Sequence, residues 1–81
     1  MIVEKTVHLT YPPHLLDQPL IYHLIRQFDL LTNILKAQVT SEAGWLILAV
    51  RGEQAQLEAG LAWITEQGVQ VEIVAEIEEE L

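Results

Sequence analysis

Cysteine is absent from the 81-residue chain, and so is a glycine-rich phosphate-binding loop. The lack of cysteine excludes disulfides, thiolate zinc sites, cysteine-bound iron–sulfur clusters and thiol catalysis. No apolar run approaches the roughly 18 residues of a membrane span. Residues 1–10 do not resemble a signal peptide, because polar and apolar side chains alternate there. We therefore expect a cytoplasmic protein with no direct membrane insertion.

Basic residues are few and scattered. The first forty residues hold three acidic and three basic side chains, whereas residues 41–81 hold nine acidic side chains and one basic. The resulting net charge of −8 repels phosphate backbones, and there is no cationic stripe to bind them. Nucleic acid is therefore excluded as a partner.

The length of the chain indicates a single domain over residues 1–81 with one hydrophobic core. We expect this core to span about residues 3–75. The acidic run at 76–81 is expected to be a solvated tail.

Hydrophobic periodicity predicts four strands and two helices. The spacing of Leu20, Leu24 and Phe28 is typical of an amphipathic helix. The segment 45–50 is apolar on both faces, as expected of a strand inside a sheet. The predicted strands are 3–11, 33–41, 45–50 and 69–74, and the predicted helices run from about 18 to 29 and from 53 to 67.

The order strand, helix, strand, strand, helix, strand predicts an α+β fold, the ferredoxin-like βαββαβ sandwich. Two right-handed crossovers then give a four-stranded antiparallel sheet with both helices on one face. Strict alternation along the second strand places Leu35 in the core under the helices and Ile34 on the open face of the sheet.

Half of that open face is expected to be apolar. Ile34, Trp45, Ile47 and Ala49 meet there, while the other two strands contribute polar side chains. An exposed apolar patch marks an interaction surface, and we expect a homodimer through these four residues. Two alternatives stay open. Either the Met1 segment or the acidic tail covers the patch, or the patch binds a larger protein and the chain is an interaction adaptor.

Residues able to carry catalysis are not grouped in the sequence. His8, His14 and His23 fall on a strand, a loop and a helix without metal-ligand spacing. Ser41 has no recognisable base, and the carboxylates of 76–80 lie in a segment too solvated to shift their pKa values. We expect no enzyme activity, no metal site and no cofactor.

Asn33 lies between Leu30-Leu31 and Ile34-Leu35, where a helix passes into a strand. One interpretation is that asparagine tolerates the irregular backbone of such a connection. The other is that its amide, both donor and acceptor, binds a ligand. Spacing alone does not decide between them.

Three segments of the chain resemble the NIL domain family, which is named for its Asn-Ile-Leu motif. They are Pro19-Leu20-Ile21 through Phe28-Asp29, Thr32-Asn33-Ile34-Leu35, and Glu66-Gln67-Gly68-Val69-Gln70-Val71-Glu72. The resemblance covers about residues 3–75. Members of the family include C-terminal regulatory domains on the ATP-binding subunits of methionine-type ABC importers, and others are fused to ferredoxin domains.

The resemblance implies a ferredoxin-like fold, pairing of two domains and, in the importer branch, binding of methionine that inhibits transport. It places a ligand at Asn33, with Ile34 and Leu35 as apolar walls. Methionine requires an apolar slot and a few placed polar groups. Because there is no phosphate loop and no cysteine, we expect a stand-alone NIL domain that neither hydrolyses ATP nor carries electrons. The leading hypothesis is a non-enzymatic regulatory domain that dimerises and senses methionine or a related amino acid.

Overall fold

The computed structural model describes residues 1–40 and 42–79, with side chains described as far as Glu76. Residues 41, 80 and 81 lie outside the described part of the chain. In chain order the elements are β1 (Ile2–Tyr11), the 3-10 helix η1 (Pro13–Leu15), α1 (Leu20–Phe28), β2 (Leu31–Val39), β3 (Gly44–Glu53), α2 (Gln54–Glu66) and β4 (Gln70–Glu79).

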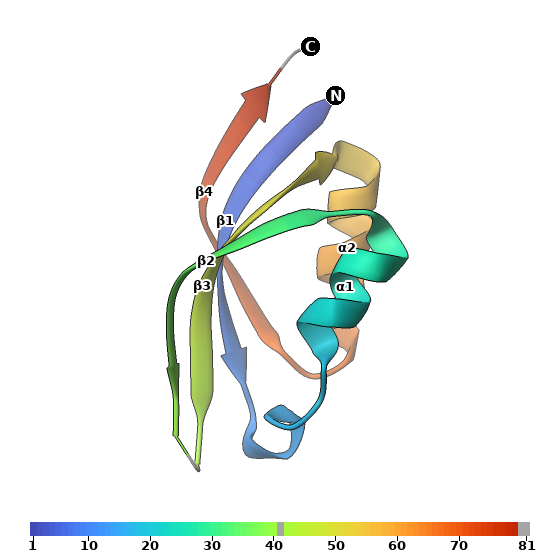
Figure 1. Ribbon diagram of the computed structural model, residues 1–81. Helices are drawn as coiled ribbons and strands as arrows, with labels where there is room; N and C mark the ends of the chain where they lie inside the picture. Colours follow the sequence, from blue (N-terminus) through green and yellow to red (C-terminus); the bar gives the residue numbers. More distant parts are fainter. Residues whose placement is uncertain (41, 80–81) are drawn as a thin grey trace.

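The strands form one antiparallel sheet in the order β2-β3-β1-β4. Figure 1 shows both helices on one side of this twisted sheet. We call the other side the open face. This arrangement confirms the predicted ferredoxin-like sandwich.

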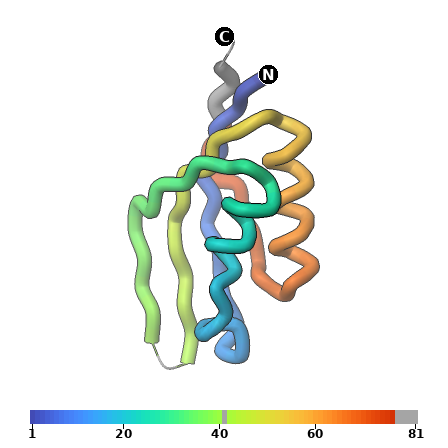
Figure 2. Tube along the Cα trace, turned by 45° about the vertical axis from the view of Figure 1, so that its right-hand side comes forward, coloured from blue at the N-terminus to red at the C-terminus, as the bar shows by residue number. Residues whose placement is uncertain are grey.

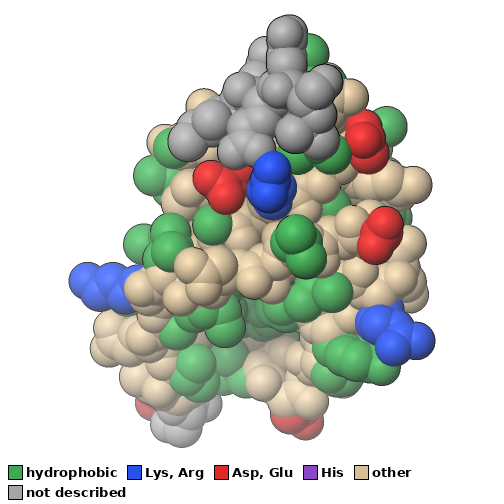
Figure 3. All heavy atoms as spheres, turned by 45° about the horizontal axis from the view of Figure 1, so that its top comes forward, with side chains coloured by type: hydrophobic (Ala, Val, Ile, Leu, Met, Phe, Trp, Pro, Cys, Tyr) green, Lys and Arg blue, Asp and Glu red, His purple; other side chains and the backbone are tan. Residues whose placement is uncertain are grey.

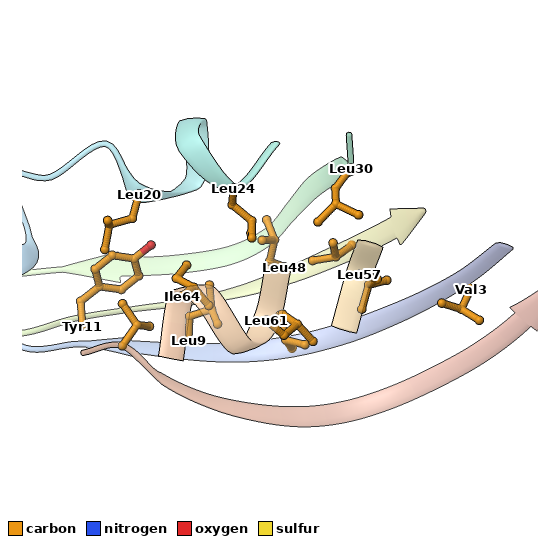
Figure 4. Packing of buried hydrophobic residues seen from close by; sticks show 13 residues of the cluster. Val3, Leu9, Tyr11, Leu20, Leu24, Leu30, Leu48, Leu57, Leu61 and Ile64 are labelled. Atoms are coloured by element: carbon orange, nitrogen blue, oxygen red, sulfur yellow. The ribbon is translucent and has the colours of Figure 1, made fainter. Parts of the chain in front are cut away.

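The core forms between the sheet and the two helices. Val3 and Leu9 of β1 are fully buried, and Figure 4 shows them on the same side of the sheet as Leu24 of α1 and Ile64 of α2. Alternate β1 residues such as Thr6 point to the open face and are only half-buried. Each fully buried large side chain stabilises the fold by about 1.5–3 kcal/mol. The alternation along β1 therefore determines which of its faces packs against the helices.

α2 approaches α1 closely at Gly60. A Cβ atom at this position would lie 2.9 Å from Leu24 Cδ1, 3.1 Å from Leu30 Cδ1 and 3.3 Å from Phe28 Cγ. α1 then ends at Asp29, whose φ of 53° turns the chain into β2. β2 therefore begins at Leu31, two residues before the Asn-Ile-Leu motif.

β2 is an edge strand that the helices leave uncovered. Figure 2 shows β2 and β3 to the left of the two helices, with β2 outermost. β2 is exposed along its length from Asn33 onward, and its exposed large hydrophobic side chains are Leu31, Ile34, Leu35 and Val39. On the surface drawn in Figure 3, hydrophobic side chains are common between scattered charged groups. The strand also begins two residues earlier than predicted and ends at Val39.

β4 continues further than the sequence indicated. It extends to Glu79 and pairs with β1 as far as Ile2. Lys5, which points into the helix-covered side, has its Nζ 3.5 Å from Glu76 Oε1 across this pairing. Residues 76–79 therefore belong to the sheet and not to the solvated tail expected at 76–81, because their backbone groups find partners in β1.

The Met1 segment does not cover the predicted apolar patch. The Met1 amino group lies 3.1 Å from Glu53 Oε2, and Ile2 is already paired in β1. Trp45 lies opposite Thr10 at the other end of β1, roughly 27 Å away at about 3.4 Å per residue. The described residues thus leave the open face uncovered at Trp45.

Candidate ligand-binding site

Asn33 lies on the open face of β2, directly opposite Ala49 of β3. The side chain is exposed and has no hydrogen-bond partner among the described residues. Alanine is the smallest side chain that β3 presents on this face, so the amide of Asn33 is not crowded by its cross-strand neighbour. The amide is both donor and acceptor and is available to a ligand approaching from the open side.

Ile34 and Leu35 do not occupy the faces that the sequence predicted. Ile34 pairs with Leu48, a buried residue of the helix-covered side, so its expected place on the open face was wrong. Leu35 was expected in the core but is 54% exposed. The cause is a bulge: the register shifts between Ile34 and Lys36, which leaves Leu35 as the extra residue and interrupts the alternation.

The other three residues of the predicted interface lie where alternation placed them. Trp45, Ile47 and Ala49 all lie on the open face and are half-buried. The ring of Trp45 stacks on His8, with 5.4 Å between ring centroids and 25° between planes. The tryptophan therefore already has an intramolecular partner, which sequence spacing did not indicate because the two residues lie on different strands.

A cavity of about 420 Å³ lies next to the motif, where the α1–β2 turn meets the start of α2. Leu31, two residues before Asn33, lies opposite Arg51 and both line this cavity. Its lining combines apolar, acidic and basic side chains: Ile2, Asp29, Leu31, Arg51, Gly52, Glu53 and Gln56. Sequence spacing does not predict this cavity, because its residues come from three separate segments of the chain.

The charges around the cavity suit a zwitterion. A guanidinium binds a carboxylate through paired hydrogen bonds, and Arg51 is the basic side chain of the lining, although it already has an interaction of its own. Asp29 and Glu53 supply carboxylates for an ammonium group, although Glu53 already contacts the chain's own amino terminus. The described residues contain no cluster of three or more histidine and acidic side chains able to hold a metal ion.

Residues 5–73 match the NIL domain family. This range covers most of the chain and includes the Asn-Ile-Leu motif. The chain belongs to the NIL domain family. The predicted family and fold are thus both confirmed, whereas the roles of Asn33, Ile34 and Leu35 in this NIL domain stay predictions.

Similar curated proteins carry the name methionine import ATP-binding protein MetN. The protein from Coxiella burnetii (strain RSA 493 / Nine Mile phase I) is 32% identical over 72 residues, which are 84% of this chain and 20% of the relative. The protein from Helicobacter hepaticus (strain ATCC 51449 / 3B1) is 36% identical over 58 residues, 67% of this chain and 16% of the relative. This NIL domain spans a fifth or less of the length of these relatives.

Solved structures share the fold. The C-terminal domain of an ABC transporter ATP-binding protein from Enterococcus faecalis matches with a TM-score of 0.76 and 20% identity, covering 88% of this chain and 83% of that one. The de novo designed protein Foldit4 matches with a TM-score of 0.62 and 9% identity, covering 99% and 100%. Because a designed protein also has this architecture, the fold by itself carries no function.

Neither helix in the described part of the chain has the length and hydrophobicity required to cross a membrane.

Proposed function

We propose that this NIL domain is a non-enzymatic, cytoplasmic regulatory module that binds methionine or a related amino acid at its Asn-Ile-Leu motif. The observation that carries the proposal is the exposed amide of Asn33, which has no intramolecular partner in the described residues. The similarity to proteins named for methionine import supports the choice of ligand.

A bound amino acid lies over the edge of β2 in this proposal. Asn33 and Ile34 point to opposite faces of the sheet, so one ligand can contact both only by crossing the strand edge. Ile34 and Leu35 then form the apolar walls for the thioether chain, and Asn33 binds the polar end. The nearby cavity at Leu31 and Arg51 supplies the cationic side chain that a carboxylate requires.

Isothermal titration calorimetry tests this site with methionine, norleucine and alanine. We expect methionine to bind, and Asn33→Ala to weaken its binding about tenfold or more, the effect of losing one hydrogen bond to a charged group. The matched control is Gln38→Ala, because Gln38 is an exposed amide on the same strand and the same face. Absence of heat with every amino acid, or equal affinities for both variants, contradicts the proposal.

Pairing with a second copy is the other part of the proposal. The β2 edge has unpaired backbone groups and exposed apolar side chains, both of which favour addition of a strand. Ile34 lies at this edge on the helix-covered side, whereas Trp45, Ile47 and Ala49 lie on the open face. A second copy added along the edge of β2 therefore contacts these four residues from both faces of the sheet. The opposite edge, β4, carries Glu72 and Glu76, whose charges oppose self-pairing.

The alternative function, a protein-interaction adaptor, is favoured by the same exposed edge. An extended peptide can add to an unpaired strand and place alternate side chains in contact with apolar residues. A protein that stays monomeric at high concentration and binds no amino acid fits the adaptor and not the sensor.

A further inference from the structure

A second cavity, of about 220 Å³, lies between the beginning of α1 and the hairpin end of β3. It is separate from the proposed methionine site, because Asn33 does not line it. Ala49, opposite Asn33, and Gly44, in the cavity wall, are five residues apart on β3, roughly 17 Å along an extended strand. The walls are mainly apolar and include Tyr11, Leu16, Leu20, Val39 and Leu46.

Tyr11 brings a polar group to this cavity. It is 8% exposed, and its hydroxyl has no hydrogen-bond partner among the described residues. Figure 4 shows the ring extending from β1 toward Leu20 of α1, with the hydroxyl at its far end. The hydroxyl oxygen is not one of the fully buried polar atoms that lack a partner, so water reaches it. A ligand in the cavity replaces that water with an acceptor or donor of its own.

The lining restricts the chemistry of the ligand. None of the side chains around the cavity is charged, so nothing there compensates the ammonium and carboxylate of an amino acid or the charge of a phosphate. An apolar cavity of about 150 Å³ in an engineered protein accommodates benzene. A volume of about 220 Å³ is therefore sufficient for one six-membered ring with small substituents.

We propose that this cavity binds a neutral, mostly apolar molecule of about one ring, held by a hydrogen bond to the Tyr11 hydroxyl. The site does not depend on the proposed methionine site, and its ligand class differs because its walls lack charge. Binding there contacts β1, α1 and the β2–β3 hairpin together, since all three contribute to the walls.

The test is a titration of the isotope-labelled protein with 4-methylphenol and with toluene, followed by backbone amide NMR signals. We expect saturable shifts at Leu20 and Gly44 but not at Asn33. Toluene, which lacks the hydroxyl, should bind about fivefold or more weakly than 4-methylphenol. In Tyr11→Phe, 4-methylphenol should lose this advantage while the affinity for toluene is unchanged.

Tyr22→Phe is the matched control, because Tyr22 is an exposed tyrosine at the rim of the same cavity. It should retain the preference for 4-methylphenol. Leu16→Trp, which fills part of the cavity, should remove binding of both probes while the amide spectrum stays that of a folded protein. If Leu16→Trp does not fold, the Tyr11→Phe comparison decides alone. No saturable shifts, equal affinities in wild type and Tyr11→Phe, or loss of preference only in Tyr22→Phe overturns the proposal.

Discussion

Asn33 and Gln38 are both exposed amides on the open face of β2, but their cross-strand neighbours differ. Asn33 lies opposite Ala49, whereas Gln38 lies opposite Trp45, whose ring is stacked on His8. A small neighbour leaves the Asn33 amide accessible from the open side. The functional interpretation of Asn33 therefore depends on one alanine in the adjacent strand as well as on the motif itself.

Tyr11 gives a prediction for stability at alkaline pH. Burial raises the pKa of Tyr11 from 10.0 to about 12. Between these values the unfolded chain releases the phenolic proton and the folded chain keeps it, so unfolding becomes more favourable as pH rises. The free energy of unfolding should fall by about 1.4 kcal/mol per pH unit from this group over that range.

Urea unfolding at pH 8 to 11.5 measures the effect. Tyr11→Phe should lose less stability on going to high pH than the wild type, because phenylalanine has no proton to release. Tyr22→Phe is the control and should follow the wild type, since Tyr22 is exposed. Identical pH dependence in Tyr11→Phe and the wild type would show that the tyrosine titrates normally in the folded state.

At the level of elements, β1 and β2 show what periodicity can predict. β1 is central, and its alternation of buried and half-buried residues follows the sequence throughout. β2 is an edge strand with a bulge at Leu35, so neither its faces nor its burial follow from alternation. The fold and the helices were thus predictable, whereas the placements of Asn33, Ile34 and Leu35 depend on pairing with β3 that sequence spacing does not contain.

Gly60, where α2 packs closely against α1, gives a prediction for the stability of the fold. In Gly60→Ala, higher helix propensity contributes about 1 kcal/mol, but the added methyl group meets Leu24, Leu30 and Phe28 at once. Overpacking of this kind costs about 1–3 kcal/mol. We expect a net destabilisation of about 1 kcal/mol in urea unfolding. Gln56→Ala, at an exposed position of the same helix, should be neutral or slightly stabilising, and a Gly60→Ala protein more stable than the wild type would contradict the close approach.

The molecule as a whole is acidic, but its apolar edge strand β2 contains no acidic residue. The net charge is −8, yet Lys36 is the one charged residue in β2. Two copies can therefore approach along β2 without opposing acidic rows. The resulting pair would join two sheets at their apolar edges and leave the acidic β4 edges on the outside.

Sedimentation velocity tests this pairing. The wild type should show a concentration-dependent dimer, and Ile34→Asp should raise its dissociation constant at least about tenfold, because each copy loses a buried apolar side chain and gains a charge. Ala62→Asp introduces the same charge at an exposed site on α2 and should leave the equilibrium nearly unchanged. A wild type that is monomeric at high micromolar concentration would rule out the homodimer.

The central claim is that the Asn-Ile-Leu motif binds an amino acid, and a methionine titration followed by backbone amide NMR tests it most directly. We predict saturable shifts centred on Asn33, Leu35 and Ala49, with little change at Gly44 in the uncharged cavity. Unchanged spectra at millimolar methionine, or shifts confined to the residues around Tyr11, would contradict the assignment of the motif as the ligand site.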